Sequence, residues 1–144
     1  MNPFLRLCLL AGCFASILAA SPPPQKTSMA GSRAHASQAT IEGLLRDIAC
    51  PIQNLDSHAT ALGMKCVLDC VKGGSPLAIL TKDGDLYLPI SDKMPDADQR
   101  QKLMPFVGKY VQASGTVFER NGTRAIVIAE IKEIKGVHLT LEGE

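Results

Sequence analysis

Four residues in the middle of the chain have side chains that commonly bind soft metal ions. They are three cysteines and one histidine: Cys50, His58, Cys66 and Cys70. Thiolates together with an imidazole suit Zn(II) in a tetrahedral site, and thiolates also bind Cu(I). The sequence therefore predicts a metal site with three cysteines and one histidine, either structural or for metal handling, and without catalysis.

The spacing of the last two cysteines favours a shared ion over a bond between them. Residues His58–Lys72 are expected to form one helix, in which Cys66 and Cys70 lie on one face. Cysteines at this spacing have Cβ atoms about 5–6 Å apart, whereas a disulfide requires about 3.5–4.5 Å. His58 lies eight residues before Cys66 on the same expected face. A short loop after the first strand would bring Cys50 over the start of this helix.

Two other interpretations of the cysteines stay open. In the first of these interpretations, Cys50 pairs with Cys66 or Cys70 in a structural disulfide, and the domain is a binding module for a protein or a small ligand. The third interpretation is a thiol oxidoreductase, although reactive dithiols usually have Cys-x-x-Cys spacing at a helix N-terminus. Met64 offers a thioether for copper, but methionine in a helix is more often part of the core.

The chain has 144 residues, and its first 20 have the layout of a secretory signal peptide. Met1–Ala20 has a basic start ending at Arg6, then a run of apolar and small residues, then small residues for cleavage. The run is too short for a membrane span, which needs about 20 residues. We therefore expect export to the periplasm or the medium. The alternative is a lipoprotein anchored through Cys13, which follows Leu-Ala-Gly.

Removal of this signal changes both the cysteine count and the charge. Cys8 and Cys13 leave, so an odd number of cysteines remains and one chain cannot pair them all. Arg6 leaves without any acid, which brings the 15 basic and 14 acidic residues to a formal net charge of zero. Nucleic-acid binding depends largely on a basic surface. The composition therefore argues against a nucleic-acid partner, and the mature chain has no second segment apolar and long enough to span a membrane.

The remaining sequence predicts one small domain that is mainly β with short helices. Residues 21–38, rich in proline, serine and alanine, are expected to form a tether, residues 39–136 the domain and residues 137–144 a tail. Asp83-Gly84 and Asn121-Gly122 each predict a hairpin turn between apolar runs. Expected elements are strands at 39–48, 76–80, 85–90, 109–118 and 125–134, and helices at 58–72 and 97–106. In the last strand Ile126 and Ile128 should face inward, followed by Ile131 and Ile134 after a register shift.

This order of elements resembles an OB-fold barrel of five strands, with the cysteine-bearing helix between the first two strands. More specifically, Ile41–Ile134 resembles small exported bacterial domains of uncharacterised function with an OB-fold-like core. The resemblance is carried by a His…Cys-x-x-x-Cys…Gly-Gly-x-Pro segment from His58 to Pro76, the hairpin Thr81–Gly84, and glycines from Gly108 onward. It implies a barrel fold and no settled activity.

Overall fold

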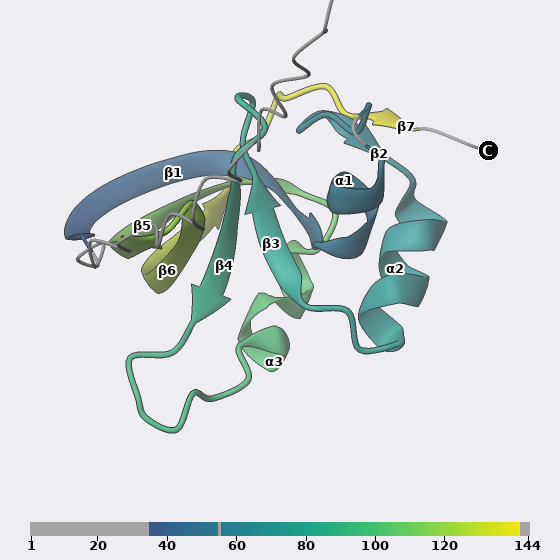
Figure 1. Cartoon of the computed structure of the whole chain (residues 1–144). Helices are drawn as coiled ribbons and strands as arrows, with labels where there is room; N and C mark the ends of the chain where they lie inside the picture. The colour runs from purple at the N-terminus through teal and green to yellow at the C-terminus, as the bar shows by residue number, and fades with distance from the viewer. Residues whose placement is uncertain (1–34, 55, 142–144) are drawn as a thin grey trace, which may run out of the picture. The chain divides into compact units, whose positions relative to one another are not determined.

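The computed structural model describes residues 35–54 and 56–141 (Figure 1). The expected signal peptide and most of the expected tether lie outside these residues. The described elements are β1 (His35–Asp47), α1 (Ala49–Gln53), β2 (Ala61–Leu62), α2 (Met64–Lys72), β3 (Leu77–Leu80), β4 (Leu86–Ile90), α3 (Arg100–Leu103), the 3-10 helix η1 (Met104–Phe106), β5 (Tyr110–Arg120), β6 (Thr123–Glu133) and β7 (Thr140–Leu141).

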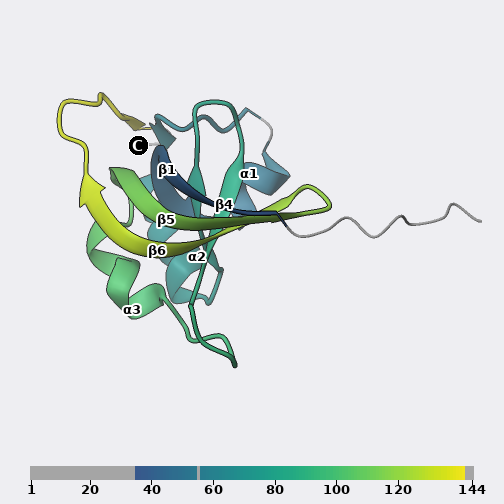
Figure 2. The same cartoon turned by 90° about the vertical axis from the view of Figure 1, so that its left-hand side faces the viewer.

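Five strands close into a barrel in the order β1-β3-β4-β6-β5. Neighbours are antiparallel except for β4 and β6, which run parallel (Figures 1 and 2). Both predicted hairpins are present, since Gly84 (φ 85°) turns β3 into β4. Asn121 (φ 52°) and Gly122 (φ 82°) turn β5 into β6, which is the backbone geometry that an Asn-Gly turn favours. The predicted small barrel with few helices is confirmed.

Two glycines let the long strands pack closely. At Gly43, β1 passes so near β3 that a Cβ atom would collide with the Leu80 carbonyl oxygen and lie 2.9 Å from Ile79 Cγ2. At Gly115 the pairing of β5 with β6 shifts register, because Ser114 faces Glu130 while Gly115 faces Ile128. This shift is the one predicted for the last strand.

The core lies inside the barrel and under its helices. Ile126 and Ile128 are buried as predicted, and Ile131 and Ile134 pack against the core from partly exposed positions. Leu103 of α3 is 1% exposed and covers one end of the barrel. None of the helices in the described ranges is long and apolar enough to cross a membrane.

The structure corrects several expected boundaries. β1 begins at His35, so residues 35–38 belong to a strand that pairs with β5 and not to the tether. The tail prediction is also wrong in part, because β7 pairs in parallel with β2. In the second expected helix, residues 97–99 are not helical, and α3 begins only at Arg100.

The largest correction concerns the helix expected from His58 to Lys72. The described helix α2 begins at Met64, and Gly63 is its N-cap. Before it, Ala61 and Leu62 pair with Thr140 and Leu141 of β7. This strand pairing, together with the weak helix propensity of Gly63, prevents the helix from starting before Met64. His58 is therefore in a loop.

Candidate metal centre

Three cysteines, Cys50, Cys66 and Cys70, come together on one side of the barrel. Their Sγ atoms all lie within 4.8 Å of one another, and those of Cys50 and Cys66 are 3.3 Å apart. All three are free thiols. Cys50 comes from α1, and Cys66 and Cys70 come from α2. Both helices lie on the side of the barrel away from the viewer in Figure 2.

The amphipathic pattern of α2 presents two of these thiols. Val67 and Val71 are 0% and 2% exposed and anchor the helix in the core. Cys66 and Cys70 each precede one of these valines, so they lie together on the adjoining face. Cys66 is exposed, and Cys50 and Cys70 are half-buried. The cluster is therefore at the surface, with solvent access through Cys66.

Two consecutive residues at the end of β1 position the segments that carry the thiols. Asp47 is fully buried, and its Oδ2 accepts a hydrogen bond from the backbone N–H of Cys50 at 2.9 Å. Arg46 is 3% exposed, and its Nη1 donates to the carbonyl oxygen of Ala61 at 3.1 Å. Because Ala61 lies just before α2, Arg46 ties the approach to α2 to the barrel while Asp47 holds α1.

Burial and the Asp47 carboxylate both raise the pKa of two of the thiols. The pKa of Cys50 is raised from its ordinary 9.0, first by burial, then by its contact with the Cys66 thiol and by the charge of Asp47. The pKa of Cys70 is raised from 9.0 by burial and next by the charge of Asp47. Both groups are therefore neutral thiols at pH 7 in the metal-free protein, and a bound cation would have to displace their protons.

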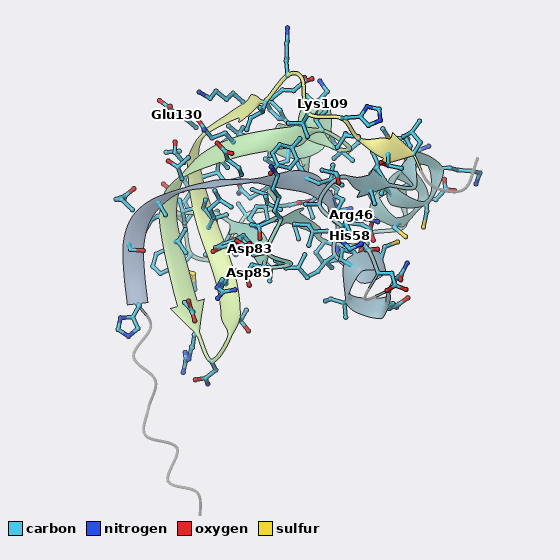
Figure 3. All side chains as sticks on the ribbon, turned by 90° about the horizontal axis from the view of Figure 1, so that it is seen from above. Arg46, His58, Asp83, Asp85, Lys109 and Glu130 are labelled. Atoms are coloured by element: carbon cyan, nitrogen blue, oxygen red, sulfur yellow. The ribbon has the colours of Figure 1, made fainter. Side chains whose placement is uncertain are left out.

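The structure brings together three of the four residues predicted for the site. His58 is exposed in the loop between α1 and β2, and its carbonyl oxygen accepts a hydrogen bond from Ala61 N–H at 3.0 Å. Its ring nitrogens are not part of the group of mutually close ligand atoms. Figure 3 labels it at the same end of the molecule as Arg46. The reason for its position is the loop that replaces the first part of the expected helix.

Met64 has a packing role in the structure. It is 37% exposed at the start of α2, and a Cβ atom on Gly108 would lie 2.7 Å from its Cε. The methionine therefore fills space beside the loop that leads into β5.

Sequence reasoning missed Arg46 and Asp47 as parts of the site. Their one signal is that two charged residues directly follow Leu44 and Leu45, which are both fully buried. Charged residues are rarely fully buried unless they are paired or have a specific role. The sequence alone does not show that this strand end is covered by α1, α2 and β2.

The geometry suits a soft cation. Three thiolates around one Zn(II), each with a bond of about 2.3 Å, have sulfur atoms roughly 3.8 Å apart. The observed separations are of that size, since the Cys50 and Cys66 sulfur atoms are 3.3 Å apart and all three lie within 4.8 Å of one another. A disulfide between Cys50 and Cys66 requires their sulfur atoms to approach from 3.3 Å to about 2.05 Å.

Comparisons with known proteins add no assignment to this geometry. No protein-family model matches the chain, and the searches of curated proteins and of solved structures return no match. The resemblance to small exported domains stays a prediction from the sequence.

Proposed function

We propose that this protein binds one soft metal ion, Zn(II) or Cu(I), through Cys50, Cys66 and Cys70, in a structural or metal-handling role without catalysis. The observation that carries the proposal is the convergence of three thiols from two helices within 4.8 Å. Soft thiolate ligands select these two ions among the common metals. The accessible Cys66 favours an ion that can be exchanged, because permanently structural zinc sites are usually closed by four protein ligands.

His58 is the candidate for the fourth ligand position. It belongs to the loop that joins α1 to β2, so it lies in the chain between the two helices that supply the thiols. A single neutral ligand can be replaced by water at a zinc site. Replacing His58 with alanine should therefore weaken binding less than replacing any of the three cysteines.

Metal analysis and a free-thiol count on the purified protein test this proposal. We expect about one ion per chain, and loss of that ion in Cys50→Ser, Cys66→Ser and Cys70→Ser. Ile52→Ser is the matched control, because it places the same side chain on the exposed surface of α1, the helix that carries Cys50, without a change of charge. Each cysteine variant should also lower the melting temperature of the metal-loaded protein, since metal binding is coupled to folding.

A second function is favoured by a different observation. The Cys50–Cys66 contact of 3.3 Å also brings two thiols close to disulfide distance. A cleft of about 340 Å³ lies between β4 and α3, with Ile48, Leu88 and Leu103 among its apolar walls. Its volume is that of a small-molecule site. Metal-free protein with one intact disulfide, and a melting temperature that a chelator does not change, would replace the metal proposal with a disulfide-stabilised binding module.

Export is a separate proposal that rests on the sequence of residues 1–20. N-terminal sequencing of the protein from the exported fraction tests it. A start at Ser21 supports a cleaved signal peptide. A lipid-modified start at Cys13 would support the lipoprotein alternative instead, and an intact Met1 would contradict both.

A further inference from the structure

The buried carboxylate of Asp47, which is hydrogen-bonded to Cys50, has one oxygen atom without a hydrogen-bond partner among the described residues. Asp47 is 0% exposed, and its Oδ2 is occupied by the Cys50 N–H. Its Oδ1 has no hydrogen-bond partner among the described residues, and the Arg46 Nε lies 3.8 Å away, which is too far for a hydrogen bond. Leaving a buried carboxylate oxygen unpartnered is unfavourable. Such a group in a native protein requires an explanation.

The position of Asp47 supplies that explanation. It lies at the end of β1, where α1 and α2 both approach the barrel. It contacts Cys50 directly through the backbone. The strand that carries it, β1, also contacts α2, the helix that supplies the other two thiols. The Nη1 of Arg46, in contrast, donates to the carbonyl oxygen of Ala61.

We propose that Asp47 determines which charge the centre prefers: its carboxylate, outside the ligand set, favours a divalent over a monovalent soft cation. This inference rests on the proposed metal-binding function and names the ion class for the same site. Three thiolates with Cu(I) leave two negative charges next to Asp47, whereas three thiolates with Zn(II) leave one. The repulsion from a fourth negative charge is therefore smaller in the zinc form.

The size of this preference follows from Coulomb's law. Asp47 Oδ2 lies 2.9 Å from the Cys50 nitrogen, so we take its separation from an ion at the Cys50 sulfur to be on the order of 6 Å. In an effective dielectric of about 20, one unit of charge at that separation changes an equilibrium constant about a hundredfold. The positive charge of Arg46 offsets part of this effect, so we expect a change of about tenfold. The protons displaced from three thiols are the same for both ions and cancel in the ratio of affinities.

The test measures Zn(II) and Cu(I) affinities by competition with chelators, without oxygen, for the full chain and for Asp47→Asn. Asparagine keeps an oxygen that can accept the Cys50 N–H, while the change removes the charge and puts an NH2 donor in place of Oδ1. The ratio of Zn(II) to Cu(I) affinity should fall about tenfold. Asp98→Asn is the matched control, because Asp98 also accepts a backbone N–H, that of Arg100, but is exposed and outside the group of mutually close ligand atoms. Its ratio should not change.

A measurement on the unmodified protein covers the case in which Asp47→Asn does not fold. During titration with Zn(II), the carboxyl-carbon NMR signal of Asp47 should shift in step with ion binding, while that of Asp98 stays in place. The inference is overturned if the affinity ratio is unchanged in Asp47→Asn, or if the carboxyl-carbon signal of Asp47 does not shift while zinc binds. The metal-binding proposal stands in both cases. If the unmodified protein binds neither ion, both are overturned.

Discussion

Replacing Gly43 with alanine tests whether the barrel closes as tightly as the structure shows. A methyl group at this position would collide with the Leu80 carbonyl oxygen and lie 2.8 Å from the Leu80 carbonyl carbon and 2.9 Å from Ile79 Cγ2. Two of these three atoms are backbone, so no rotation of a side chain can relieve the collision. β1 and β3 must separate beside the Leu44–Leu80 pair, where β3 ends.

We expect this change to lower the free energy of unfolding by about 2–3 kcal/mol, in the upper part of the range for overpacked cores. At about 4–8 °C per kcal/mol for a domain of this size, the melting temperature should fall by roughly 10–20 °C. Denaturant unfolding and thermal melts of the metal-free protein measure both quantities.

Gly73→Ala is the control for the added methyl group. Gly73 has φ −72°, and a Cβ atom there would be 3.3 Å from the Asp69 carbonyl oxygen and 3.5 Å from that of Cys70. Its stability should change by less than about 1 kcal/mol. If Gly43→Ala is as stable as Gly73→Ala, then β1 and β3 are not in the close contact on which the positions of Arg46 and Asp47 depend.

Four further predictions concern the helices and the thiols. Val71→Ala should destabilise the metal-free protein by about 1.5–2.5 kcal/mol through lost burial and a cavity, and Zn(II) at about 100 times its dissociation constant should restore about 2.7 kcal/mol in thermal melts. Metal affinity should fall as pH is lowered, about tenfold per pH unit for each thiol that must lose a proton, in chelator competition at several pH values. Because burial raises the pKa of Cys50 and Cys70 above 9.0, the metal-free protein should also lose stability as pH rises through these raised values, while below pH 9 the contribution is fully present. Leu103→Ala should lower the free energy of unfolding by about 2–5 kcal/mol in denaturant titrations, since this side chain is 1% exposed at the barrel end.

The barrel could be predicted from the sequence because the residues that specify its turns and strands lie close together in the chain. Asp83-Gly84 and Asn121-Gly122 specify their turns through backbone conformations that few other residues adopt readily. Alternating isoleucines mark the inner face of the last strand, including the shift beside Gly115. The convergence of Cys66 and Cys70 was also local, because it depends only on helical spacing.

The parts that were missed depend on contacts between distant segments. Nothing near Ala61 indicates a strand, because its partner is Thr140 at the other end of the domain. Residues 35–38 lack an apolar pattern and form a strand by pairing with β5. The Nε2 of Gln38 donates a hydrogen bond of 2.8 Å to Thr116 Oγ1 in this pairing. His58 was misplaced for the same reason, since the helix that was expected to carry it is interrupted by the β2–β7 pair.

The place of the thiols in the chain has a consequence for the order of assembly. Cys50 and Cys66 are 16 residues apart, whereas Glu42 and Gln112, which bond across the pair that closes the barrel, are 70 apart. Closing the longer loop costs about 1 kcal/mol more in chain entropy. The segment from Cys50 to Cys66 can therefore bring its thiols together before β1 and β5 pair to close the barrel. An ion that binds these thiols in the unfolded chain would speed the closure of this shorter loop. The same early binding would reduce the net stabilisation that the ion gives to the finished fold.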